Sequence, residues 1–123
     1  AKEVRVALAS KENLSQAAFR KLFATRDFAV IEALLSNSGN AEYFSKDMLA
    51  GLISQSEFAH IVARGLGDFP NADDSIGEAL AAHPDPYVRH AMAGYYDAPK
   101  KLLRMLANDV DPAVARSAKQ TLE

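Results

Sequence analysis

The sequence has 123 residues, with 49% hydrophobic and 24% charged side chains, a composition typical of one folded domain. It contains no cysteine, which excludes disulfides, thiolate metal sites, iron–sulfur clusters and a cysteine nucleophile. No apolar run approaches the roughly 18 residues of a membrane helix, and no signal peptide is recognisable. We therefore expect a cytoplasmic protein with no membrane partner.

Similar short sequence patterns recur along the chain. An acidic residue followed by proline or phenylalanine stands at Asp27, Glu57, Asp85 and Asp111, with separations of 30, 28 and 26 residues. A leucine lies five positions before each acid and a small residue six positions after it: Leu22, Leu52, Leu80 and Leu106, then Ala33, Ala63, Ala91 and Ser117. These columns predict a single domain, 1–123, with approximate repeats 1–26, 27–56, 57–84 and 85–110 and a partial repeat 111–123.

Each repeat is predicted to contain two helices. The first repeat opens within a helix from Val4. In later repeats the first helix begins at the acid, which caps the helix N-terminus, and covers segments such as 30–36 and 88–94. Gly65 and Gly94 stand where such a helix could end in a left-handed residue.

The second helix of each repeat is predicted to be the longer one. Apolar residues three and four positions apart, as in Ala18, Phe19 and Leu22, give it an amphipathic stripe. Its start is marked by Ser15, Ser45, Asp73 or Pro99. No segment alternates with period two, so we expect an all-α chain. A unit of about 26 residues cannot bury its apolar face alone, and about four two-helix repeats must therefore stack into an α-solenoid.

The best-ordered stretch is LAAHPDPYVRHAMAGYYDAPKKLLRMLANDVDPAVA (80–115), in which the informative positions are Leu80, Asp85, Pro86, Val88, Arg89, Ala91, Pro99, Leu102, Leu103, Leu106 and Ala107. It resembles the bacterial leucine-rich repeat variant, a HEAT-like helical repeat; the resemblance is looser over 1–79, where proline is missing from the caps. It implies a right-handed superhelix of short, sometimes 3₁₀, helices alternating with α-helices. It also implies a binding scaffold without catalytic residues. The iron–sulfur cluster of some members needs cysteines, which this chain lacks.

The usual catalytic motifs are absent from the sequence, and we expect no catalytic residue, no cofactor and no metal. His83, Asp85 and His90 could suggest a metal site. A structural interpretation is stronger, because Asp85 is explained as an N-cap that Arg89 can pair with one turn later. The acidic loop 68–74 lacks the spaced ligand series of a calcium loop.

Equivalent positions line up across stacked repeats, so surface columns are candidate partner sites. Two polar columns lie off the apolar stripe of the second helices and should face outward. Tyr95 and Tyr96 form an aromatic pair that could be a hot spot if exposed, although packing between repeats explains it better. The candidate partner-binding residues are Gln16, Arg20, Lys46, Asp74, Glu78, Tyr95, Tyr96, Lys100 and Arg104.

Charge is unevenly distributed along the chain, whose formal net charge is −2. Residues 1–41 carry six basic and four acidic side chains, residues 42–86 two and eight, and residues 87–123 six and four. The acidic segment 42–86 would interrupt the continuous row of basic side chains that binding to a nucleic-acid duplex needs, so we expect no nucleic-acid partner. The patch formed by Lys100, Lys101 and Arg104 is interpreted as a solvated helix face.

These observations favour a non-catalytic scaffold for protein–protein interaction, with a protein as its partner. The alternative is a helical-repeat enzyme or enzyme subunit that acts on nucleic acid or a protein-bound cofactor, with Asp74 or Glu78 as a lone carboxylate. A further hypothesis is that the chain is the stable core of a longer repeat protein, because the pattern begins and ends inside a repeat. The exposed repeat ends could also self-associate by stacking.

Overall fold

The computed structural model describes residues 2–11 and 14–123, and within them all regular structure is helical. The prediction of an all-α chain is confirmed for these residues. In chain order, the helices are α1 (Lys2–Ala9), α2 (Gln16–Ala24), α3 (Phe28–Ser36), the 3₁₀ helix η1 (Ser38–Tyr43), α4 (Lys46–Leu52), α5 (Ser56–Arg64), the 3₁₀ helix η2 (Leu66–Asp68), α6 (Asp74–Ala81), α7 (Pro86–Ala93), α8 (Lys100–Leu106) and α9 (Pro112–Leu122).

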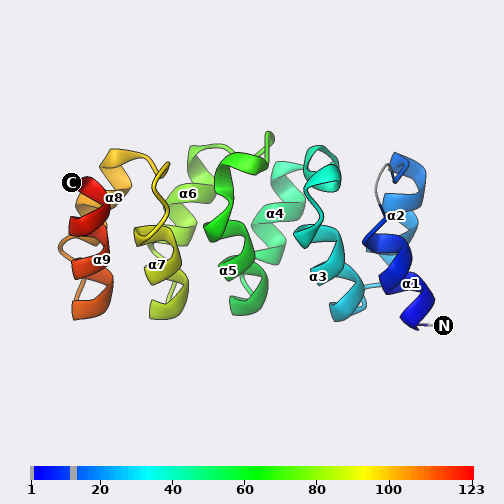
Figure 1. Cartoon of the computed structure of the whole chain (residues 1–123), viewed down its shortest axis with the longest axis horizontal. Helices are drawn as coiled ribbons and strands as arrows, with labels where there is room; N and C mark the ends of the chain where they lie inside the picture. Colours follow the sequence, from blue (N-terminus) through cyan, green and yellow to red (C-terminus); the bar gives the residue numbers. More distant parts are fainter. Residues whose placement is uncertain (1, 12–13) are drawn as a thin grey trace.

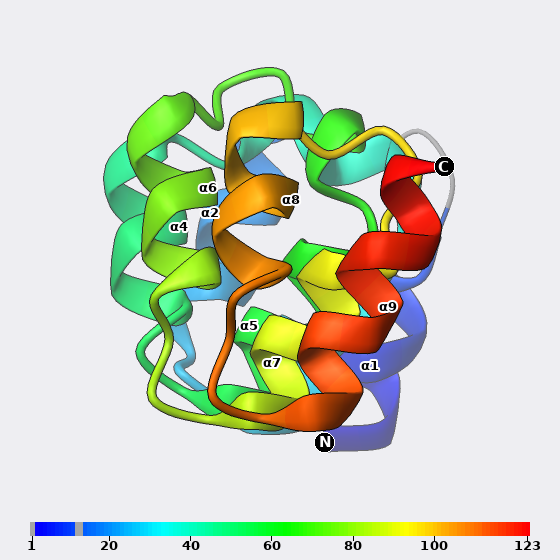
Figure 2. The same ribbon diagram turned by 90° about the vertical axis from the view of Figure 1, so that its left-hand side faces the viewer.

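The helices form two layers. The odd-numbered helices α1 to α9 stand side by side in chain order in one layer, and α2, α4, α6 and α8 form the other (Figure 1, Figure 2). The two termini lie at opposite ends of the row (Figure 1). Each odd-numbered helix contacts the next one, and the two layers contact each other along the row. The long dimension of the molecule therefore follows the order of the sequence.

Side-chain caps fix where most of the helices begin. In each case a side-chain oxygen accepts a hydrogen bond from a first-turn N–H that the helix itself leaves unpaired. The caps are Ser15 for α2, Ser45 for α4, Asp73 for α6, Asp27 for α3, Asp85 for α7 and Asp111 for α9. Pro99 precedes α8 and makes no such bond. The four predicted starts of the second helices are thus confirmed.

One predicted start, that of α5, is wrong. The acid column places it at Glu57, but the helix begins at Ser56, and Gln55 is its N-cap residue without a side-chain bond. In α3 the buried side chains lie three, four, seven and eight residues after the cap, and α5 shows this spacing only when counted from Gln55. Burial of the apolar face therefore sets the register, two residues earlier than the acid suggests. Ala63 consequently does not occupy the position of Ala33.

Two further predictions, one about helix length and one about helix ends, are also wrong. The second helices are not the longer ones, since α4 and α8 have 7 residues each whereas α3 and α5 have 9. Gly65 and Gly94 do end α5 and α7, but with φ of −140° and −87°. Their N–H groups still bond back to helical carbonyls, that of Gly65 three residues back in a tightened last turn and that of Gly94 four residues back, so neither helix end needs a left-handed residue.

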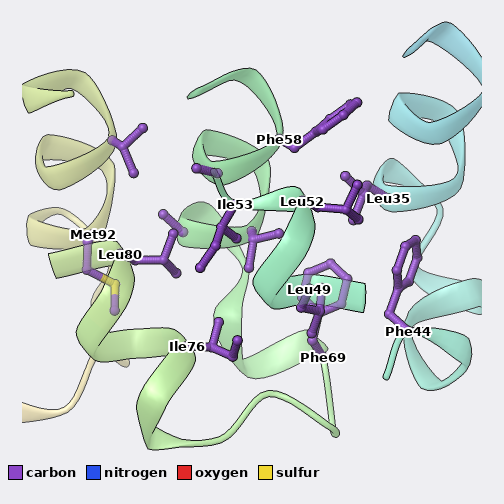
Figure 3. Close-up of a cluster of buried hydrophobic side chains, with 14 of the residues drawn as sticks. Leu35, Phe44, Leu49, Leu52, Ile53, Phe58, Phe69, Ile76, Leu80 and Met92 are labelled. Carbon is purple, nitrogen blue, oxygen red and sulfur yellow. The ribbon is translucent and has the colours of Figure 1, made fainter. Parts of the chain in front are cut away.

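The buried side chains form one hydrophobic core, part of which is shown in Figure 3. Phe44 and Phe69, which follow η1 and η2, both reach into it and meet edge to face with ring centroids 5.9 Å apart. Phe44 also meets Phe19 of α2 at 4.9 Å. Aromatic rings from the connections thus tie three successive helix pairs together, which adds specific geometry to the area that they bury.

Side-chain hydrogen bonds join neighbouring helix pairs at about the spacing that the sequence predicts for a repeat. The Asn40 amide donates to the last carbonyl of α1, and the Thr121 hydroxyl donates to the last carbonyl of α7. His83 Nε2 lies 2.9 Å from the carbonyl that follows α4. These bonds span 28 to 31 residues along the chain. They satisfy carbonyls that a helix C-terminus leaves unpaired and so fix the register between neighbouring pairs.

Candidate functional site

The two predicted polar columns face outward, as expected. Every member of them is exposed on α2, α4, α6 or α8: Gln16, Lys46, Asp74 and Lys100, then Arg20, Ala50, Glu78 and Arg104. None of these side chains belongs to the buried core. The outer face of the even-numbered layer is therefore available to a partner without any change in packing.

A hollow of about 430 Å³ opens beside α6 and α8 and brings part of this surface together. Three predicted residues line it, namely Asp74 and Glu78 from α6 and Tyr95 from the connection before α8. The remaining candidates do not line it: Gln16, Arg20, Lys46, Tyr96, Lys100 and Arg104. The predicted surface is thus divided into a part that lines the hollow and a part that lies outside it.

The floor of the hollow is apolar. It is formed by Leu66, Phe69 and Leu102, together with Gly77 in the middle of α6. A Cβ added to Gly77 would lie 3.1 Å from Leu102 Cδ1 and 3.5 Å from Leu66 Cδ2. Glycine at this position therefore lets both leucines pack directly against the backbone of α6.

Tyr95 forms one wall. Its hydroxyl accepts a hydrogen bond of 3.0 Å from the N–H of Gly67, and a Cβ on Gly67 would lie only 2.5 Å from that oxygen. Tyr95 is therefore packed between helix pairs, in agreement with the structural interpretation of the aromatic pair. Tyr96, by contrast, is 85% exposed and meets the Tyr95 ring edge to face at 5.7 Å.

The rim of the hollow is acidic. Asp73, Asp74, Glu78 and Asp97 line it, with Lys101 as the opposing charge. Asp73 accepts hydrogen bonds from the Ser75 hydroxyl and N–H and lies 3.3 Å from Lys46 Nζ. The Ser75 bond first, and Lys46 second, hold the pKa of Asp73 below its usual value.

The other three rim carboxylates, those of Asp74, Glu78 and Asp97, differ from Asp73. Within residues 2–11 and 14–123, neither ion pairs nor side-chain hydrogen bonds engage them. Their negative charge is therefore not neutralised by neighbouring side chains, and it faces solvent over an apolar floor.

Two of the three residues that suggested a metal, His83 and Asp85, have structural roles. His83 Nδ1 accepts the N–H of Asp85, and its Nε2 therefore carries the proton that bonds the carbonyl of Ile53. Both ring nitrogens are thus engaged with backbone. In the part of the chain that the structure describes, no group of three or more His, Asp and Glu residues is arranged to hold a metal ion.

Arg89 does not pair with Asp85 as expected. Its guanidinium instead forms a two-pronged pair with Asp109, at 2.8 and 3.2 Å, and donates to the carbonyls of His83 and Pro84. Both side chains are largely buried, with exposed fractions of 14% for Arg89 and 10% for Asp109. Through Arg89, which lies in α7, these bonds join the turn before α7 to Asp109 in the turn before α9. The role of the pair is therefore structural.

Sequence reasoning missed two of the residues that shape the hollow. Asp97 completes the rim, and Phe69 forms part of the floor from the loop before α6. Neither belongs to a repeat column, because both lie in connections of variable length. A usable signal was the proline near each of them, Pro70 and Pro99, since proline marks and stiffens a connection.

None of the helices in the described residues is long and apolar enough to cross a membrane. Comparison with known proteins finds no matching family model, no similar curated protein and no similar solved structure.

Proposed function

We propose that this chain is a right-handed α-solenoid of HEAT-like repeats, akin to the leucine-rich repeat variant, and acts as a non-catalytic scaffold for a protein partner. The layered order of helix pairs and the bonds between them at the repeat spacing support the repeat architecture. Repeat stacks of this kind present long continuous surfaces, which suits a binding role.

The observation that carries the proposal is the hollow beside α6 and α8. The exposed carboxylates of Asp74, Glu78 and Asp97 converge there with Tyr95 around a partly apolar lining. Concave sites with an apolar lining and a few polar groups are the usual form of a binding site. The polar columns on α2 and α4 extend the same face and would supply the rim of a larger interface.

Affinity capture from the source lysate tests this function. The intact chain serves as bait, with and without nuclease, and bound proteins are identified by mass spectrometry. We expect one discrete protein whose capture is unaffected by nuclease and is lost when the bait carries Asp74→Lys/Glu78→Lys. The bait Glu32→Lys/Glu123→Lys changes the net charge equally at exposed positions outside the hollow and should still capture it.

One outcome would contradict the proposed site, and another would contradict the scaffold. If the charge-reversed bait captures the same protein, the face of α6 is not the site. If capture collapses on nuclease treatment, the chain binds nucleic acid, and the exposed Lys100, Lys101 and Arg104 become the residues to substitute. Circular dichroism of each bait establishes that helicity is unchanged.

A further inference from the structure

We propose that the hollow beside α6 and α8 receives an arginine or lysine side chain from an extended basic segment of the protein partner. This inference rests on the proposed scaffold function and names the chemistry of its partner. It is carried by the combination of an apolar floor with an unneutralised acidic rim in one groove.

Charge complementarity sets the sign of the occupant. The carboxylates of Asp73, Asp74, Glu78 and Asp97 line the hollow with the ammonium of Lys101, and because Lys46 already pairs with Asp73, an excess of two negative charges remains. Among residues 2–11 and 14–123, Asp73 is the one rim carboxylate that belongs to an ion pair. An anionic or neutral segment would leave these charges facing one another, whereas a cationic side chain lowers their mutual repulsion.

The shape and polarity of the groove identify the kind of cation. Leu66, Pro70 and Pro99 line the hollow without being buried and offer apolar surface, which a small hydrated ion cannot use. Arginine and lysine have apolar stems that cover such surface while the charged head stays at the rim. The ring of Tyr95 forms one wall, where a guanidinium or ammonium gains a further attraction from the aromatic face.

Neighbouring surface favours a peptide over a free polyamine. Tyr96 stands beside this wall and is 85% exposed, so it can contact residues that flank the bound side chain. Exposed tyrosine is among the side chains that contribute most to protein interfaces. A polyamine carries charge but no flanking side chains and would leave Tyr96 unused.

A synthetic array of decapeptides, with arginine, lysine, leucine, glutamate and serine distributed over all positions, tests the partner chemistry on the intact chain. We expect the bound peptides to be enriched in arginine or lysine. Enrichment in glutamate, or no enrichment, would overturn the inference. Fluorescence anisotropy of the strongest binder then measures affinity, with spermidine as a competing cation.

The variants have opposite expected effects. Asp74→Asn/Glu78→Gln should weaken peptide binding about tenfold, and Glu32→Gln/Glu123→Gln should leave it unchanged. Lys101→Met should tighten binding, because it removes a positive charge from the lining; a damaged fold could not produce this gain. Equal binding by all variants, or spermidine that binds as tightly as the peptide, would refute a peptide site here.

The failure of this inference is distinguishable from that of the scaffold function. If lysate capture succeeds and depends on Asp74 and Glu78 while the array shows no basic preference, the scaffold stands and the partner chemistry is wrong. If nuclease-resistant capture fails altogether, the scaffold function fails, whatever the array shows.

Discussion

The pair between Arg89 and Asp109 should be a main determinant of stability, and Arg89→Met tests this. The substitution keeps the length of an apolar stem but removes two bonds to Asp109 and two to the carbonyls of His83 and Pro84. It leaves the Asp109 carboxylate, only 10% exposed, with the N–H of Asp111 as its remaining hydrogen-bond donor.

The magnitude follows from the burial of the pair. Removing one partner of a buried ion pair costs roughly 3–5 kcal/mol, and the residual exposure places this case at about 3 kcal/mol. At about 4 °C per kcal/mol for a domain of this size, Tm should fall by about 12 °C. Urea unfolding and thermal melts followed by circular dichroism measure both quantities at pH 7.

Lys46→Met is the matched control, since it breaks an ion pair whose side chains are 53% and 47% exposed. Exposed pairs contribute little because solvent screens them, so its Tm should stay close to that of the unsubstituted chain. If Arg89→Met lowers Tm no more than Lys46→Met does, the pair does not hold the turns before α7 and α9 together, and the reasoning is refuted.

The same pair predicts a pH dependence. The bond from Arg89 holds the pKa of Asp109 below its usual value, so the folded protein binds that proton less readily than the unfolded chain. Its stabilising contribution is complete above the ordinary carboxyl pKa and is lost as the pH falls through the lowered value. The stability difference between the unsubstituted chain and Arg89→Met should therefore shrink in acid; a difference that stays constant down to pH 2 would contradict this assignment.

Four other substitutions have defined expected results in urea unfolding at neutral pH. Arg26→Gly should stabilise the protein by about 0.5–1 kcal/mol, because this residue has a φ of 55° that costs a residue with a Cβ more than glycine; destabilisation would show that the Arg26 side chain makes a necessary contact. Asp27→Ala should cost about 1 kcal/mol through loss of two capping bonds, and no loss would mean that water replaces them. Leu80→Ala, at a position with no exposed surface, should cost about 2–5 kcal/mol as a cavity forms, and a smaller loss would indicate that the core collapses around it. Gly67→Ala should cost about 1 kcal/mol by displacing the Tyr95 hydroxyl, and adding Tyr95→Phe should relieve part of this loss; additive costs would rule out that contact as the cause.

Local signals in the sequence determined much of the helix pattern. A cap such as Ser45 or Asp111 satisfies amides within its own first turn, so the start of that helix depends on residues only two or three positions away. The leucine columns were predictable for a related reason, because an amphipathic stripe follows from helical periodicity alone. All four column leucines, Leu22, Leu52, Leu80 and Leu106, are buried.

The candidate site was predictable only in part. Outward-facing residues such as Asp74 and Glu78 follow from the same periodicity, since they lie off the apolar stripe. The sequence did not predict that Tyr95 and Asp97 line the same hollow. These two residues lie in a connection, and the path of a connection depends on what it packs against. The N–H of Gly67, 28 residues earlier in the chain, holds Tyr95 in place.

What only the tertiary structure decided were features that depend on contacts between helix pairs. The start of α5 follows the burial of its apolar face and not the charge of Glu57, since burying several apolar side chains outweighs a single charge near a helix end. Arg89 bonds to Asp109, 20 residues away, although Asp85 is nearer in sequence. The sequence by itself thus determined where most helices form and which face is apolar, because those properties are local. Packing decided register, ion pairing and the hollow, because each of them requires two segments that meet only in the folded chain.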